Sequence, residues 1–416
     1  MKNTIKMSLV AALAVAGLST TASAGGLEEA IKGVTISGKM EVEYDYVETK
    51  DSGLAVPGTA DGKSTDRQWD IDWDMTAKVP VNDMVTAVFG VEGDTESDTN
   101  GGVTGGALVT GSAAGSNAES TINITKTYFQ YANGPVTALV GKQGMAGAPW
   151  FDDERGNGVV GLYNAGPVTL AAAHFTNNNS LGNANITALA AIASVGPVNA
   201  QLWYAELSGL AGAAGVGTGV WDADSFAILA DATFDIVNVG VKYAQADYDL
   251  GNPVAGIYNQ GNDDAEMLQV LVSADFGVAK PYAGYGATDS KQGGAGLDLT
   301  GDTDSTLDFG SEQLSIDDLD NADAFLIGVT VPVGAVTIDA SYVWGDYDSY
   351  FVADKDAGTA YACDLEEFLV QVDYKMSKNF TIGAHFSDSE LEYQTSAVLK
   401  DKIEVTNAAV SLEYKF

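Results

Sequence analysis

Long segments of this chain alternate apolar and polar residues with a period of two, and this pattern limits the folds open to it. Residues 34–46 and 336–345 alternate in this way, as do residues 68–79, whose apolar positions are Trp69, Ile71, Trp73, Met75, Ala77 and Val79. A period of two places successive side chains on opposite faces of a β-strand, whereas a helix needs a period of 3.6. The pattern therefore predicts strands with one apolar and one polar face.

The alternation predicts about eighteen strands, with sixteen as the alternative count. Several exceed the length of about 5–6 residues that is usual in globular proteins, and they suit a tilted strand of about 9–11 residues across a bilayer. The expected strands cover residues 33–47, 65–79, 83–95, 119–132, 135–143, 159–164, 166–175, 184–195, 197–207, 222–235, 236–248, 264–276, 278–288, 322–331, 333–347, 365–376, 379–392 and 403–416.

The connections between these strands alternate between short and long. Short ones include Asn133-Gly134 and Ser377-Lys378, and the long ones cover residues 48–64, 96–118, 144–158, 208–221, 249–263, 289–321, 349–364 and 393–402. An up-and-down barrel with short periplasmic turns and long external loops produces this alternation, whereas a β-sandwich or a solenoid does not. The sequence therefore predicts an all-β fold, a transmembrane antiparallel up-and-down β-barrel.

The N-terminal segment has the features of a secretory signal peptide. Lys2 and Lys6 precede a short apolar run over residues 9–18, and Ala22-Ser23-Ala24 supplies small residues for cleavage. The run is shorter than the roughly 20 residues that a transmembrane helix needs. We expect residues 1–24 to be the signal peptide and residues 25–416 to form the barrel.

The C-terminal segment matches the assembly signal of outer-membrane barrels. Ala408, Val410, Leu412, Tyr414 and Phe416 share one face, and the sequence ends on Phe416. We expect Tyr414 and Phe416 to be recognised by the barrel assembly machinery; the alternative is an ordinary amphipathic edge strand. The expected location is the outer membrane, in contact with the lipid bilayer and lipopolysaccharide.

The charge balance excludes some partners. The formal net charge of −37 argues against nucleic acid, because phosphate binding needs Lys and Arg. Two explanations remain open, which are solubility and a surface or channel that gathers cations. Cys363 is the single cysteine, which rules out a disulfide within the chain, and the two histidines make a His-rich zinc site improbable.

Two stretches and the C-terminal strand resemble a known family. Residues 26–38 (GLEEAIKGVTISG) are similar to the mature start of the major outer-membrane porin of Campylobacter and related epsilonproteobacteria. Residues 141–144 (GKQG), with Trp150, Asp152, residues 158–161 and residues 168–172, are similar to an internal region of the same family, and residues 412–416 also fit. The resemblance implies an eighteen-stranded homotrimeric porin of Gram-negative bacteria for ions and small hydrophilic solutes.

The third long connection, residues 144–158, is the expected pore constriction. It combines three acids, one arginine and two aromatic residues between glycines. Porins commonly narrow their lumen with an inward-folded third loop, and facing acids and bases create a transverse field. The candidate constriction residues are Asp152, Asp153, Glu154 and Arg155; the alternative is an exposed polar turn.

The polar positions of the alternating strands are the expected pore lining. They are Lys39, Glu41, Glu43, Asp70, Asp72 and Asp74, to which we add Lys142 near the constriction. The alternative for most of them is simple solvation of a wet wall. Acidic residues recur in residues 289–321, and hard cations bind oxygen ligands of this kind. Their spacing matches no calcium loop, so we interpret this connection as a solvated surface loop, with binding of divalent cations as the alternative.

These features together predict an outer-membrane porin for passive diffusion, with a preference for cations and no cofactor. The chain has neither a Gly-x-Ser-x-Gly nucleophile elbow nor a phosphate loop, so no enzyme activity is expected. Two alternatives remain open, which are a substrate-selective channel and a surface adhesin or structural barrel.

Overall fold

The computed structural model describes residues 33–51, 63–98, 121–145, 148–150, 155–178, 184–211, 220–249, 263–290, 309, 319–349, 361–396 and 399–416. Within these residues the regular elements are eighteen strands. Their bounds are β1 Thr35–Asp51, β2 Lys63–Pro80, β3 Val85–Asp98, β4 Thr121–Asn133, β5 Val136–Gly144, β6 Arg155–Ala165, β7 Val168–Asn178, β8 Asn185–Val195, β9 Val198–Ala211, β10 Val220–Phe234, β11 Val237–Asp249, β12 Asp263–Ala274, β13 Lys280–Ser290, β14 Asp320–Val333, β15 Val336–Ser349, β16 Tyr361–Lys375, β17 Phe380–Ser396 and β18 Leu399–Lys415.

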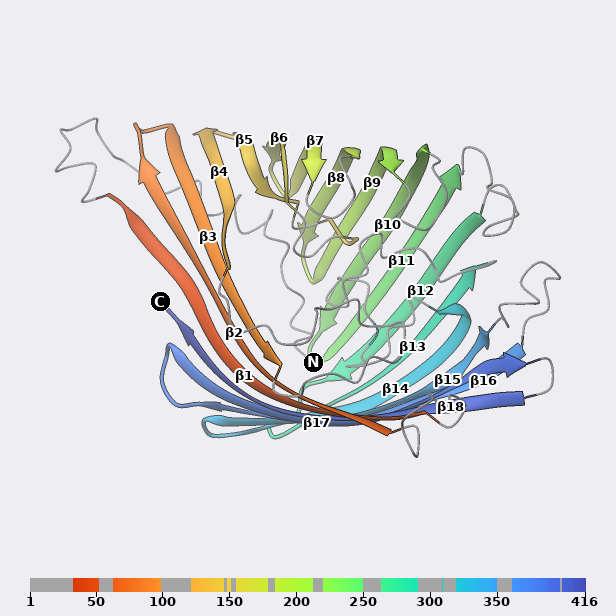
Figure 1. Ribbon diagram of the computed structural model, residues 1–416. Coiled ribbons are helices and arrows are strands. Elements are labelled where there is room, and N and C mark those ends of the chain that lie inside the picture. Colours follow the sequence, from red (N-terminus) through yellow and green to blue (C-terminus); the bar gives the residue numbers. More distant parts are fainter. Residues whose placement is uncertain are drawn as a thin grey trace.

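The strands form one closed antiparallel barrel. Each strand pairs with its neighbours in sequence, and β1 pairs with both β2 and β18 (Figure 1). Closure matters because an open sheet edge in hydrocarbon would leave backbone groups without hydrogen bonds, at a cost of several kcal/mol for each group. The eighteen-stranded all-β barrel predicted from the sequence is confirmed. No helix long and apolar enough to cross a membrane occurs in the part of the chain that the structure describes.

Each predicted strand corresponds to one observed strand, and the largest difference in a strand's beginning is four residues, which occurs in β6, β16 and β18. The prediction began β6 at Val159, whereas it begins at Arg155. Gly156 and Gly158 suggested a loop, but they are needed for close pairing with β7. A Cβ atom at Gly158 would lie 2.3 Å from the carbonyl oxygen of His174. The predicted connection over residues 144–158 therefore shortens, since Gly144 ends β5 and Arg155 already pairs with it.

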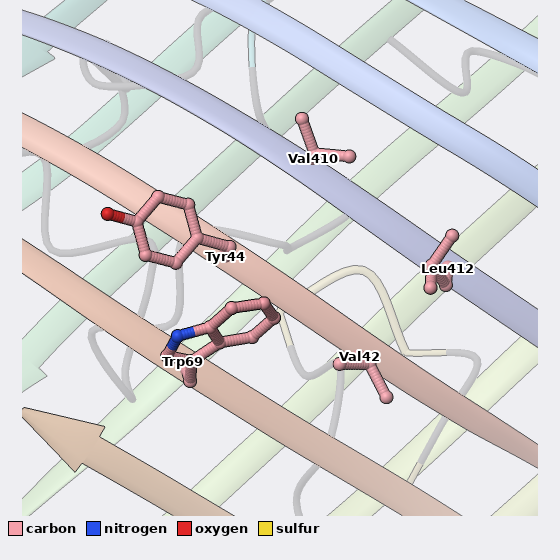
Figure 2. Close-up of a pocket in the computed structure, with 5 residues that line it drawn as sticks. All are labelled: Val42, Tyr44, Trp69, Val410 and Leu412. Atoms are coloured by element: carbon pink, nitrogen blue, oxygen red, sulfur yellow. The ribbon is translucent and has the colours of Figure 1, made fainter.

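The outer face of the barrel is apolar. Large side chains such as Ile36, Phe89 and Phe129 are about half exposed on it, at 56%, 49% and 59%. A groove of about 310 Å³ lies on this face between β18, β1 and β2. Figure 2 shows the side chains that line it, which are Val42, Tyr44, Trp69, Val410 and Leu412. Apolar side chains exposed over the whole surface of a closed barrel suit hydrocarbon rather than water.

The seam between β1 and β18 closes on a glycine. Gly38 and Phe416 exchange two backbone hydrogen bonds, each with an N–O distance of 3.1 Å. The Phe416 ring lies against Gly38 and stacks on Tyr414, with 6.0 Å between the ring centroids. A Cβ atom at Gly38 would lie 2.2 Å from the Asp74 carbonyl oxygen on β2 and 2.7 Å from Cζ of Phe416. Glycine at this position therefore lets three strands approach one another.

Gly38→Ala should weaken the seam. The added methyl group overpacks the β18–β1–β2 contact, which typically costs about 1–3 kcal/mol. The control is Gly161→Ala, where a Cβ atom would meet nothing closer than the Ala172 carbonyl oxygen at 3.9 Å. The measurement is the temperature at which the folded band disappears from an SDS gel of detergent-extracted protein. Equal temperatures for the two variants would contradict the role of Gly38.

Candidate functional site

Strand alternation gathers most of the acidic side chains of β1, β2 and β18 on the inner face of the barrel. The registers pair Lys39 with Asp74, Glu41 with Asp72 and Glu43 with Asp70. On the other side of β1, Glu41 also lies opposite Glu413. These positions are opposite in parity to the outer-face residues of Figure 2, so their side chains face inward. We call this surface the acidic wall; its charged members are Lys39, Glu41, Glu43, Asp45, Asp70, Asp72, Asp74, Lys78, Glu413 and Lys415.

Local ion pairs compensate only part of the charge on the acidic wall. The Lys39 Nζ atom lies 2.7 Å from Glu41 Oε2, and the Lys415 Nζ atom lies 2.6 Å from Glu413 Oε1. Carboxylates nevertheless outnumber lysines on these three strands. Like charges opposite each other on neighbouring strands are unfavourable, and cations in the lumen reduce this repulsion.

The inner face of β6–β12 has the opposite character. It carries small and apolar side chains that form one buried cluster, and we call it the apolar wall. Its members are Leu162, Phe175, Ile186, Ala188, Ala190, Ile192, Trp203, Ala205, Leu207, Ala223, Ala227, Leu229, Ala244, Ala246, Ala265 and Met267. Apolar side chains facing a water-filled lumen would be unfavourable, so this wall needs a cover.

Residues of the third connection supply part of that cover. Met145, Ala148 and Trp150 belong to the same buried cluster, and the Trp150 side chain is completely buried. The described residues after β5, which are Met145 and residues 148–150, therefore lie inside the barrel. The inward direction expected for this connection is found at these residues, while Asp152, Asp153 and Glu154 lie outside the described residues.

Arg155 links the base of this connection to the acidic side of the interior. Its guanidinium group donates two hydrogen bonds to the Glu92 carboxylate on β3, from Nη1 to Oε1 and from Nη2 to Oε2, both at 2.5 Å. The two side chains are only 20% and 25% exposed. Because Glu92 pairs with Asp74 in the β2–β3 register, the guanidinium group is held beside the acidic wall.

The sequence did not single out Glu92. The available signal was the predicted strand over residues 83–95, in which the polar Glu92 alternates with apolar Val91, but Gly90 and Gly93 interrupt the pattern. Its pairing with Arg155 depends on the turn of the chain into the lumen, which no local pattern specifies.

Lys142 does not lie where the sequence predicted. The registers pair it with Thr127 and Asn157, on the face that carries Val140 and Val159. Its ammonium group donates a hydrogen bond of 2.6 Å to the Ile124 carbonyl oxygen. Strand parity thus places Lys142 on the outer face rather than in the lumen. The prediction followed the neighbouring constriction and not the alternation of β5.

A second connection also sends a residue into the interior. Phe309 is only 4% exposed and belongs to a buried cluster with Leu326, Val343 and Leu365 on the inner faces of β14, β15 and β16. One edge of its ring would lie 3.2 Å from a Cβ atom at Gly284. The connection over residues 289–321 therefore reaches the lumen at Phe309. This differs from the surface loop that we expected from the sequence. Most of its acids lie outside the described residues.

Metal-binding groups are not assembled in the described part of the chain. No three His, Cys, Asp or Glu side chains come close enough there to hold a metal ion. Cys363 is completely buried on the inner face of β16.

Two family models match the chain. The Campylobacter major outer membrane protein family matches residues 1–177, and the Gram-negative porin family matches residues 245–393. No curated protein sequence matches the chain.

Solved structures share the fold at low sequence identity. OccK9 (OpdG) of Pseudomonas aeruginosa aligns with a TM-score of 0.63 and 12% identity, over 93% of this chain and 100% of that one. A BenF-like porin from Pseudomonas fluorescens Pf-5 gives 0.63 and 14%, over 92% and 99%. OccK2 (OpdF) of Pseudomonas aeruginosa, in complex with glucuronate, gives 0.61 and 12%, over 92% and 98%. These likenesses establish the architecture of the barrel.

Trp150→Ala should lower the stability of the barrel. Truncating a buried tryptophan typically costs about 3–5 kcal/mol, because it leaves a cavity in the cluster. The matched control is Trp69→Ala on the outer face, where the side chain is 46% exposed and its ring contact with Tyr44 is worth only about 1 kcal/mol. Thermal unfolding of both variants in detergent, followed by circular dichroism, measures the difference. An equal loss in the two variants would contradict a role for Trp150 in anchoring the connection.

Proposed function

We propose that this chain, an outer-membrane porin, is a passive diffusion channel that prefers cations. The two porin families and the closed eighteen-stranded barrel give its class and its location in the outer membrane. The preference for cations and the residues responsible for it are the part that we add. Diffusion through such a lumen requires neither a cofactor nor catalysis.

The acidic wall is the observation that carries this proposal. Glu41, Glu43, Asp70, Asp72 and Asp74 face inward on two adjacent strands, and Glu413 adjoins them on β18. A lumen surrounded by material of low dielectric concentrates the field of such charges, which raises the local concentration of cations and lowers that of anions.

The constriction belongs to the same proposal. Met145 and Trp150 support an inward course of the third connection, so Asp152, Asp153 and Glu154 would meet the permeating ion where the lumen is narrowest. Arg155 would oppose them, but its charge is partly compensated by Glu92.

A substrate-selective channel is the main alternative. OccK2 has been solved with glucuronate, a carboxylate solute. The acidic wall would repel such an anion, which favours a general channel for cations and neutral hydrophilic solutes. A surface adhesin would need loops whose binding surfaces lie outside the described residues, so no specific observation favours it.

We also propose the partners and processing that the sequence suggests. These are a homotrimer, cleavage of the signal peptide after Ala24, insertion by the barrel assembly machinery through Tyr414 and Phe416, and contact with lipopolysaccharide. The apolar outer face supports contact with lipid, and the position of Phe416 at the β1–β18 seam supports its role in assembly. A mass close to three chains, measured by light scattering with the detergent contribution subtracted, is the expected result for a homotrimer, and a single-chain mass would contradict it.

Open channels should pass K⁺ more readily than Cl⁻. Neutralising Asp152, Asp153 and Glu154 to Asn, Asn and Gln should reduce this preference more than neutralising eight acids of the connection over residues 289–321. Those acids are Asp298, Asp302, Asp304, Asp308, Glu312, Asp317, Asp318 and Asp320. At physiological salt the screening length is about 8 Å, so charges far from the narrowest point have little effect on a permeating ion.

The measurement is the reversal potential in a planar bilayer under a KCl gradient. Arg155→Gln should shift it further toward K⁺, because one cationic charge is lost and Glu92 loses its partner. A wild-type reversal potential that favours Cl⁻ would refute the preference. Equal effects of the two sets of neutralised acids would place the constriction elsewhere.

A further inference from the structure

The Arg155–Glu92 pair spans an unusual distance within the barrel wall. Arg155 begins β6 and Glu92 lies on β3, so β4 and β5 stand between them. At roughly 4.8 Å per strand, the two backbones are about 14 Å apart along the wall. The ion pair therefore spans β4 and β5, unlike the Lys39–Glu41 and Lys415–Glu413 pairs, each of which lies within one strand.

The pair stands where the third connection leaves the wall. β5 ends at Gly144 and β6 begins at Arg155, and these two residues are register partners. The residues that follow Gly144 enter the interior and pack on the apolar wall through Met145, Ala148 and Trp150. Apolar contacts of Met145, Ala148 and Trp150 attach the connection to the apolar wall. The Arg155–Glu92 pair attaches the base of the connection, at Arg155, beside the acidic wall.

The geometry of the contact favours arginine. Two parallel N–H···O bonds to one carboxylate use the planar fork of the guanidinium group, which a lysine ammonium cannot reproduce. Both side chains are largely shielded from solvent, so the pair is less screened by salt than an exposed pair. These features suit a contact that fixes a position rather than one that only balances charge.

We propose that Glu92 is a positioning residue for the base of the third connection, where Gly144 ends β5 and Arg155 begins β6. Its carboxylate holds Arg155, which fixes the base of the third connection beside the acidic wall. The inference rests on the proposed channel function and adds a residue that controls both the steadiness of the open pore and its selectivity.

The test compares Glu92→Gln with the matched control Glu41→Gln. Each variant removes one inward acid and deprives one cation of its ion pair, but only Glu92 is bonded to the third connection. Both variants should lose part of the preference for K⁺. Only Glu92→Gln should also show increased open-channel current noise and closure at lower voltage in planar bilayers, because the base of the connection is released.

Two further variants separate position from charge. Arg155→Lys keeps the net charge but loses the two-point contact, so it should be noisier than wild type with little change in reversal potential. The exchange Glu92→Arg with Arg155→Glu restores an arginine–carboxylate pair and should bring the noise back toward the wild-type level. Heat-modifiability on SDS gels verifies that each variant is a folded barrel.

The outcomes distinguish this inference from the proposed function. Wild-type channels without K⁺ preference would refute the cation proposal and leave the noise comparison intact. If the current noise of Glu92→Gln and Arg155→Lys is as low as that of Glu41→Gln, the positioning role is overturned. Noise in the exchange variant as high as in Glu92→Gln would also overturn it, because the two residues would then act independently.

Discussion

The pairing of β1 with β18 is the interaction on which the rest of the structure depends. Hydrocarbon offers no hydrogen-bond partners to the backbone, so a sheet in the membrane is stable only when its first and last strands meet. Closure in turn gives every strand one inward and one outward face. It therefore determines whether a polar or an apolar position of the sequence faces the lumen or the membrane. The seam is tight because Gly38 allows β2, β1 and Phe416 to approach one another.

The interior of the barrel is divided between two kinds of wall. The acidic wall of β1, β2 and β18 faces the lumen, whereas β6–β12 present alanine and larger apolar residues covered in part by Met145, Ala148 and Trp150. Under the proposed function, ions would follow an off-centre path along the acidic side, because packed side chains occupy the opposite side. The lumen is thus shaped as much by hydrophobic burial as by charge.

Much of the fold could be predicted from the sequence, because alternation and connection length act locally. In the strands over residues 68–79 and 336–345 the alternation assigns each residue to one face. The inward orientation of Asp70, Asp72 and Asp74 follows directly from this alternation. Lys142 was misplaced because proximity to the constriction outweighed the parity of its own strand. The Arg155–Glu92 pair and the burial of Phe309 could not be predicted, since they depend on where chain segments turn after leaving the wall. The apolar wall was also hidden, because strands such as β8 are apolar on both faces and show no alternation.

The seam also has a consequence for the order of events during folding. It joins residues at nearly opposite ends of the chain, for example Lys50 and Glu404, which are 354 positions apart and form an ion pair of 3.5 Å. Contacts between such distant residues are slow to form because the entropy of closing the loop must be overcome first. Hairpins between neighbouring strands can form early, but the ring cannot close until β18 is available. Until then, β1 and the growing end of the sheet expose unpaired edges that can pair with other chains, so the unfinished barrel needs protection that the closed barrel does not.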